Sequence, residues 1–472
     1  MTRWRSELVT AALLLGALAV RLWRLGADSL WFDEVCSLEF AQRPLIAIVT
    51  DTRETNPPLY YALLHGWIGL FGTSEVALRF LSVGFGVAAV GLAGWVGHLL
   101  GGRRLAWVAM GLMAVAPLPV EYAQTARAYS LFLAASIGSF GCLLAWLRRR
   151  TWRWALAYVL ITAVMSFAHY YWVFNVIAQQ GYLGWQVWRK EVSGRAWAVV
   201  LALLAAGCLP WAGVLISQAV RVHQEGFWIP RMDRWKFLGV VGSYVTVGSR
   251  QAAWWYLALA AFGCWRLRVR RSLVLAWLLC PLLIPFVLSH VSTPIFVGYY
   301  TIAAAPALYL LLGNGWLHLP GRWLKTVVAT AMIAAASISL GRVYQREMEP
   351  WRALVRTVEQ ALHPADAVVV FGLAARPFEY YYRGSAPLHH VSAGSAEGVQ
   401  AGLSSGGLMP GCERVWLVIR KDPYTDPQVI LKAFLKRYPQ AQQLEARSYQ
   451  DQLFVYGVEL GRELSRPRLA QT

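Results

Sequence analysis

The sequence predicts a polytopic α-helical membrane protein with about eleven transmembrane helices and a small C-terminal α/β domain. Composition is the first reason: 57% of the 472 residues are hydrophobic and 15% are charged, whereas a soluble domain has roughly 45–50% and 25%. The second reason is a series of apolar stretches of spanning length before residue 342. The third is that such stretches stop there, and strand-like and helix-like segments then alternate.

Eleven apolar stretches are predicted to span the membrane. The first follows Arg3 and Arg5, and we interpret it as a retained span because no small-residue cleavage site separates it from Asp33. We expect Arg21 and Arg24, at its far end, to extend toward the headgroups. The stretches are 7–23, 75–100, 105–120, 125–147, 153–168, 170–188, 196–218, 251–265, 272–289, 296–316 and 323–341.

Arginine and lysine residues predict the orientation of the spans. They gather in alternate connections, and short loops rich in these residues face the cytoplasm. The same pattern accounts for the net charge of +19 and argues against nucleic-acid binding. A bacterial-type inner or plasma membrane is expected. The basic connections contain Arg103, Arg104, Arg148, Arg149, Arg150, Arg153, Arg189, Lys190, Arg195, Arg266, Arg268, Arg270, Arg271, Arg322 and Lys325.

The opposite connections are predicted to face outward, and they hold most of the unusual polar residues. The longest is 24–74, in which we expect interfacial helices at about 38–49 and from Asn56 onward. The second of these helices starts at Pro57-Pro58, which suits a helix N-terminus. A plain buried loop helix is the alternative for that segment.

Residues 346–472 are predicted to form the extracytoplasmic α/β domain, after a transmembrane domain of residues 1–345. Helices are expected at 351–362 and 428–438, and strands at 367–372, 414–419 and 452–456. A Gly/Ser-rich loop is expected at 394–411. Neither a GxGxxG motif nor a P-loop occurs in the sequence, so nucleotide binding is not supported.

Two adjacent acids, Asp33 and Glu34, lie among apolar residues just after the first span. They are either a solvated pair at a helix N-terminus or a functional pair, because burying a carboxylate without a partner costs several kcal/mol. In the functional interpretation Asp33 takes a proton from an acceptor as general base. Glu34 or Glu121 then orients the acceptor or shares a divalent cation such as Mg²⁺ or Mn²⁺.

Arg127 and His169 are two further candidates at other outward connections. Arg127, at the mouth of a span, is suited to holding a phosphate through paired charged hydrogen bonds. Its alternative is a salt bridge to Glu121 across the turn. His169 lies beside Tyr170 and is either a site residue or part of an interfacial aromatic belt.

These motifs, taken in order, resemble those of the GT-C integral-membrane glycosyltransferases. The resemblance is to the broad group that includes protein O-mannosyltransferases and lipid A aminoarabinose transferases. It covers about 1–345 in topology and is sharpest over 29–172. The motifs are Leu30-Trp31-Phe32-Asp33-Glu34, Asn56-Pro57-Pro58-Leu59-Tyr60-Tyr61, Glu75-Val76-Ala77-Leu78-Arg79-Phe80, Gln124-x-x-Arg127-x-Tyr129 and His169-Tyr170.

The resemblance implies an inverting membrane glycosyltransferase that takes its sugar from a polyprenyl-phosphate donor and has a lipid, glycan or protein acceptor. It implies that Asp33 is the catalytic base, with Glu34 as its acidic neighbour. Asp33 and Glu121 are the candidate metal ligands. The residues expected to bind the donor phosphate or substrate are Glu121, Gln124, Arg127, Tyr129, His169, Tyr170 and Tyr299.

Two departures from the family pattern leave other interpretations open. Thr125 stands where relatives often have Glu, and Gly298 stands where they often have Arg. Phosphate binding then depends on Arg127 or on other cations (Arg221, Arg231 and Lys236), or the chain is a divergent inactive relative that acts as a scaffold. A transporter or flippase of lipid-linked sugars is the other alternative, although no internal repeat of the kind common in transporters is found.

Overall fold

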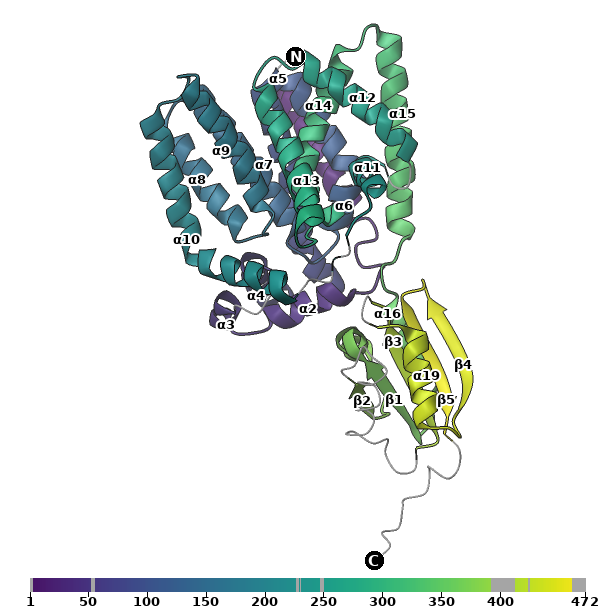
Figure 1. The fold of residues 1–472 in the computed structure, drawn as a ribbon. Helices are drawn as coiled ribbons and strands as arrows, with labels where there is room; N and C mark the ends of the chain where they lie inside the picture. Colours follow the sequence, from purple (N-terminus) through teal and green to yellow (C-terminus); the bar gives the residue numbers. More distant parts are fainter. Residues whose placement is uncertain are drawn as a thin grey trace, which may run out of the picture. The chain divides into compact units, whose positions relative to one another are not determined.

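The computed structural model describes residues 3–51, 56–225, 229, 231–246, 250–391, 412–422 and 425–460. The chain forms two compact units, and Figure 1 labels many of their elements. The first, called here the helical unit, comprises Met1–Leu25 and Phe40–Arg346. The second, the α/β unit, combines Gly26–Glu39 with Glu347–Thr472, so a short N-terminal segment groups with the C-terminal region.

The helical unit contains a helix over each predicted apolar stretch. Five of the described helices are long and apolar enough to cross a membrane (α5, α7, α10, α13 and α15), so the number eleven is not confirmed. The elements are α1 (Arg3–Leu22), α3 (Leu45–Thr50), α4 (Leu59–Phe71), α5 (Glu75–Val115), α6 (Pro117–Ala123), α7 (Tyr129–Arg149), α8 (Trp152–Ser166), α9 (Trp172–Trp188), α10 (Gly194–Glu225), α11 (Arg234–Ser243), α12 (Arg250–Arg266), α13 (Arg271–Val291), η1 (Gly298–Ala304), α14 (Ala305–His318) and α15 (Arg322–Gln345).

Helix α5 is a hairpin of two antiparallel arms. Its backbone leaves the helical region at Gly101 and at Gly102, where φ is 75°. The arms are in contact, because a Cβ atom on Gly97 would lie 3.0 Å from the Cα of Ala106 and one on Gly94 would lie 2.6 Å from the Cγ of Met110. Glycine permits both the turn and this close approach. The predicted stretch 75–100 therefore corresponds to the first arm of this hairpin, and the start of the stretch 105–120 corresponds to the second.

Helix α7 is the central helix of the unit, and it is buried from Tyr129 to Leu147. Hydrogen bonds join it to its neighbours: Ser139 Oγ lies 2.8 Å from the donor Nε2 of Gln179 on α9 and 2.7 Å from Thr162 Oγ1 on α8. Tyr158 of α8 donates to Gln179 Oε1 over 3.0 Å. Small and hydroxyl side chains at such contacts suit helix packing in a membrane, where no hydrophobic driving force separates helix from lipid.

Arg21 is buried and does not extend to the headgroups as expected. Its guanidinium donates to the carbonyl oxygens of Ala17, Met113 and Ala114 over 3.0–3.1 Å. It therefore satisfies carbonyls at the end of α5, which a helix leaves without partners. Arg24 is exposed.

The α/β unit is a five-stranded sheet of order β2-β1-β3-β5-β4 (Figure 1). Strands β2, β1 and β3 are parallel, and β5 joins β3 and β4 antiparallel. One face packs on α19 and the other on α16 and α17. The elements are α16 (Trp351–Ala361), β1 (Asp366–Phe371), η2 (Gly372–Ala374), α17 (Ala375–Tyr381), β2 (Leu388–Val391), β3 (Arg414–Arg420), α19 (Pro427–Arg437), β4 (Gln442–Tyr449) and β5 (Leu453–Glu459).

The predicted secondary structure of this region is confirmed, with additions. The expected helices are α16 and α19, and the expected strands are β1, β3 and β5. Strands β2 and β4 and helix α17 were not predicted. The Gly/Ser-rich segment 394–411 lies outside the described residues.

The long loop 24–74 carries helices, as predicted, but the first of them is broken. The segment 38–49 contains the end of α2 (Phe32–Ala41) and most of α3. Pro44 stands at the N-cap of α3, and proline cannot continue a helix from the preceding turn. Helix α4 starts after Pro58, as expected.

Candidate functional site

Six aromatic side chains gather in the helical unit, and we call them the aromatic cluster. Three separate connections bring them together: the short helix α6 with the start of α7, the turn between α8 and α9, and the 3₁₀ helix η1. The members are Tyr122, Tyr129, His169, Tyr171, Tyr299 and Tyr300.

The rings pack by stacking and by edge-to-face contact, as aromatic pairs prefer. Tyr122 stacks on Tyr299 with centroids 5.1 Å apart. Tyr129 lies edge-on to Tyr299 at 5.3 Å and stacks on Tyr300 at 6.0 Å. His169 packs edge-on to Tyr300 at 4.9 Å. The cluster thus packs the N-terminal end of α7 against η1.

Arg127 lies beside this cluster and is 7% exposed. Its Cζ atom is 6.0 Å from the ring centre of Tyr129, and Nη1 donates to the hydroxyl of Tyr61 over 3.3 Å. Tyr61 belongs to α4, whose Tyr60 bonds to Ser82 on α5 over 2.8 Å. Helix α4 therefore helps to hold the guanidinium, and a buried, always charged group of this kind is suited to a phosphate or carboxylate.

No ion pair joins Arg127 to Glu121 among the described residues, so the salt-bridge alternative is not what the structure contains. Burial raises the pKa of Glu121, and the positive charge of Arg346 partly offsets this increase. Glu121 is thus a carboxyl in a poorly solvated place near another arginine.

His169 is a neutral imidazole whose tautomer the backbone sets. The backbone N–H of Tyr171 donates to His169 Nδ1 over 3.2 Å, so the ring proton lies on Nε2. Burial, with the nearby positive charge of Arg127, lowers the pKa of His169 to about 3. His169 can therefore donate a hydrogen bond through Nε2 but does not act as a cation at neutral pH.

Two further candidates differ in their surroundings. Gln124 uses its side-chain amide to donate to the carbonyls of Arg21 and Trp23, over 3.0 and 2.7 Å, and so holds the end of α1. Tyr170 is half-buried in the same turn as His169.

The cluster includes three residues that were not among the predicted site residues: Tyr122, Tyr171 and Tyr300. Each is adjacent in the chain to a predicted one or lies within its motif. Aromatic residues next to motif residues were therefore the available signal. Tyr171 also connects two loops, because its hydroxyl donates to the carbonyl of Ile295 over 2.6 Å.

Asp33 and Glu34 lie in the first turn of α2, in the part that belongs to the α/β unit. Glu34 is buried, and its Oε2 accepts the backbone N–H of Trp31 over 3.3 Å. This bond is the return half of a capping box, in which the third helical residue reaches back to the residue before the helix. Glu34 therefore caps the helix N-terminus, but it is buried and not solvated as that alternative expected. Asp33 is half-buried beside it.

The predicted metal ligands are Asp33 and Glu121. Among the described residues no group of three or more His, Cys, Asp or Glu side chains gathers as metal binding would require. Asp33 and Glu121 belong to different units.

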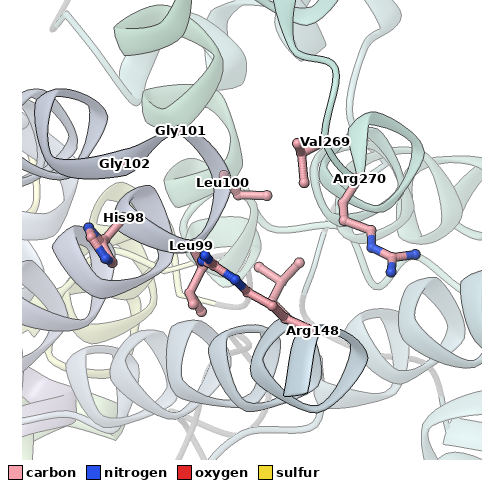
Figure 2. A pocket seen from close by; sticks show the side chains of 9 residues that line it. His98, Leu99, Leu100, Gly101, Gly102, Arg148, Val269 and Arg270 are labelled. Carbon is pink, nitrogen blue, oxygen red and sulfur yellow. The ribbon is translucent and has the colours of Figure 1, made fainter. Parts of the chain in front are cut away.

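A cavity of about 500 Å³ lies elsewhere in the helical unit, at the turn of the α5 hairpin (Figure 2). Leu144 and Arg148 line it from the far end of α7, and Arg270 from the start of α13. Arg148 follows Tyr129 by 19 positions along α7, a rise of roughly 28 Å. The cavity is therefore distant from the aromatic cluster.

Helices of spanning length and an α/β unit indicate an integral membrane protein, and its fold is similar to that of solved GT-C glycosyltransferases, as the motifs predicted. The chain is similar to ArnT from Cupriavidus metallidurans in the apo state, with TM-score 0.63 and 14% identity over 97% of this chain and 99% of ArnT. It is also similar to ArnT bound to undecaprenyl phosphate, with TM-score 0.57, 15% identity and the same coverage.

A third similar structure is the oligosaccharyltransferase of Archaeoglobus fulgidus, with TM-score 0.57 and 11% identity over 89% of this chain and 70% of that one. That protein has also been solved with Zn and sulfate, and with an inhibitory peptide and a dolichol-phosphate. No family model matches the sequence, and no curated protein matches it. The likeness is therefore one of fold.

Proposed function

We propose that this protein is a glycosyltransferase that moves a sugar from a polyprenyl-phosphate donor to an acceptor on the extracytoplasmic side of the membrane. The observation that carries the proposal is the likeness to ArnT bound to undecaprenyl phosphate, which extends over 97% of this chain. A likeness of this extent includes the membrane helices and the appended domain alike.

The buried guanidinium of Arg127 supports a phosphate-linked donor. Charge-assisted hydrogen bonds from arginine to phosphate are strong and are often bidentate. The hydroxyl of Tyr61 and the ring of Tyr129 orient the guanidinium. His169 Nε2–H is a neutral donor in the same cluster, so it can hydrogen-bond an oxygen without adding charge.

The proposed reaction is a single displacement at the anomeric carbon. Asp33 takes the proton of the acceptor hydroxyl or amine as general base. The acceptor atom forms a bond to the anomeric carbon from the side opposite the phosphate. The bond between that carbon and the phosphate oxygen breaks, polyprenyl phosphate leaves with the electron pair, and the configuration inverts. Arg127 stabilises the charge on the departing phosphate.

The acceptor class stays open among lipid, glycan and protein. The archaeal oligosaccharyltransferase has been solved with a tethered acceptor peptide, so the fold accommodates a peptide acceptor in that protein.

The test replaces Asp33 by Asn. Glycolipids and glycans are compared by mass spectrometry in cells that lack the protein and in cells that express each variant. We expect the wild type, but not Asp33→Asn, to restore a product heavier by one sugar. Asp51→Asn is the matched control, because Asp51 lies in the same loop and pairs with exposed Arg43 over 3.0 Å. Full restoration by Asp33→Asn would remove Asp33 as the base.

A transporter of lipid-linked sugars predicts a different result. Vesicles reconstituted with the protein would then move a labelled polyprenyl-phosphate-linked sugar between leaflets, and Asp33→Asn would retain this movement. Sugar transfer by the purified protein in nanodiscs contradicts a pure transporter, because a transporter leaves the bond to phosphate intact.

A further inference from the structure

The α/β unit holds the segment Gly26–Glu39 through several backbone hydrogen bonds. The N–H of Ser29 donates to Glu347 Oε1 over 3.1 Å, and the N–H of Leu30 donates to the hydroxyl of Tyr381 over 2.6 Å. The N–H of Phe32 donates to Glu349 Oε2 over 3.0 Å. Three successive anchor points therefore lie within the five residues before Glu34.

Arginine side chains add contacts at both ends of the segment. Arg352 donates to the carbonyls of Gly26 and Ala27 over 3.3 and 2.5 Å. Arg376 pairs with Glu39 over 3.2 Å and donates to Cys36 Sγ over 3.3 Å. The segment is thus held along its whole length.

These contacts lie at the carboxyl end of the parallel strands, where α/β folds usually bind ligands. Strand β1 has β2 on one side and β3 on the other, so the strand order reverses beside β1. Ligands bind in the crevice at the carboxyl ends of such strands. Arg420 ends β3, and Tyr381 ends α17, which follows β1. Here the chain's own segment occupies that position.

Glu349 is the central residue of this contact, and it is 2% exposed. Its Oε1 accepts Arg420 Nε over 2.8 Å, and its Oε2 accepts Trp351 Nε1 over 2.7 Å in addition to the N–H of Phe32. The guanidinium of Arg420 also lies 5.1 Å from the ring centre of Phe32. One buried carboxylate therefore fixes both the backbone and, through Arg420, the side chain of the residue before Asp33.

We infer that the α/β unit is a positioning element for Asp33 and that Glu349 is its principal positioning residue. The inference rests on the proposed function, in which Asp33 is the base. A general base must stay within hydrogen-bond reach of the acceptor, and a displacement of about 1 Å can cost about 100-fold in rate. Glu349 acts through the backbone of Phe32 and does not itself contact substrate.

The test compares Glu349→Ala and Glu349→Gln with Asp366→Asn in the full-length protein in nanodiscs. Asp366 is a matched control, because it is a buried acid of the same unit that pairs with Arg414 over 3.0 Å. It lies at the start of β1, the opposite end of the sheet. Both kinds of variant weaken the unit, and the Glu349 variants alone lose contacts to the segment.

Hydrogen exchange is the first measurement, and it does not depend on catalysis. In Glu349→Ala we expect exchange of the amides at 29–34 to accelerate by about tenfold or more, since a hydrogen bond to a charged group is lost. Asp366→Asn should leave these amides protected. Equal exchange at 29–34 in Glu349→Ala and the wild type would overturn the inference.

Turnover is the second measurement, made with the donor and acceptor that the mass-spectrometry comparison identifies. We expect kcat to fall by about 10- to 100-fold in Glu349→Ala with little change in undecaprenyl phosphate binding, and less in Glu349→Gln. Glu349→Ala in the Asp33→Asn background should cost nothing further. An additive loss in that double variant would overturn the inference. A wild type without transferase activity would overturn the proposed function. The exchange result would still show whether Glu349 holds the segment Gly26–Glu39 in place.

Discussion

His169 lies in the turn between α8 and α9 and contacts several aromatic rings. Its ring packs against Phe132, Tyr171 and Tyr300 at centroid distances of 4.9–5.6 Å. The backbone N–H of Tyr171 occupies Nδ1. Enclosure by rings removes water, and the acceptor role of Nδ1 favours the neutral form. His169 is thus a fixed hydrogen-bond donor.

Because the pKa of His169 is about 3 in the folded protein, against 6.5 for an ordinary histidine, stability should depend on pH. Between these values the unfolded chain binds the proton and the folded protein does not, so the free energy of unfolding falls as pH falls below 6.5. The slope attributable to His169 is at most about 1.4 kcal/mol per pH unit. Thermal unfolding at pH 7 and pH 5 should show a smaller pH effect in His169→Phe than in the wild type.

His290→Gln is the control for that experiment, because His290 is exposed at the end of α13. An unchanged pH effect in His169→Phe would mean that His169 is not held neutral.

The sequence identifies unusual polar residues, but it does not show which of them belong to a site. Asp33, Arg127 and His169 were singled out because charged or polar types at outward connections are unusual. Other polar side chains form hydrogen bonds with backbone atoms: Glu34 caps α2, Gln124 holds the end of α1, and Arg21 donates to carbonyls of α5. Residue type does not distinguish a ligand-binding group from one that satisfies backbone atoms, because both need the same donors and acceptors.

At the scale of elements, the helices were predictable because each apolar stretch is long. Strands β1 and β3 were predictable as continuous apolar runs. Strand β4 was not, because it is an edge strand that is mostly exposed and carries Gln, Glu, Arg and Ser. Strand β2 has four residues, too few for a pattern. The hairpin of α5 was predicted as two stretches, and the turn at Gly101–Gly102 explains them.

Helices α12 and α14 approach so closely that only glycine fits between them. A Cβ atom on Gly263 would overlap the carbonyl oxygen of Leu311 and would lie 2.7 Å from the backbone N of Gly315. Asn314 also donates to the carbonyl of Gly263 over 2.8 Å. Gly263→Ala should therefore separate the helices and destabilise the protein by about 1–3 kcal/mol, measured as a lower Tm in detergent.

Gly111→Ala is the matched control for the helix contact. Gly111 lies inside α5, and a Cβ atom there would have no atom within 4 Å. Alanine in a helix is favoured over glycine by about 0.5–1 kcal/mol, so this variant should keep or slightly raise Tm. Equal Tm values in the two variants would contradict the close helix contact.

At the scale of the whole molecule, the grouping of Gly26–Glu39 with the C-terminal region was not predictable from one sequence. Its hydrogen bonds join residues more than 300 positions apart, such as Phe32 and Glu349. No local period or motif records such a pairing. The consequence is that the α/β unit combines a segment from near the start of the chain with the C-terminal region.

Asp33 belongs to the same unit as the C-terminal strands. One labelling experiment on those strands therefore also reports on which side of the membrane Asp33 lies. The basic connections predict that unit outside and the turn after α7 inside. A cysteine placed at Asp451, in the exposed turn before β5, should therefore react with a membrane-impermeant maleimide in intact spheroplasts. A cysteine at exposed Thr151 should react only after permeabilisation.

The wild type is the control without added cysteines, because none of its six cysteines is fully exposed. Burial also raises the pKa of Cys36 to about 11, which leaves little reactive thiolate. Labelling of residue 451 only after permeabilisation would place Asp33 in the cytoplasm and remove the extracytoplasmic reaction.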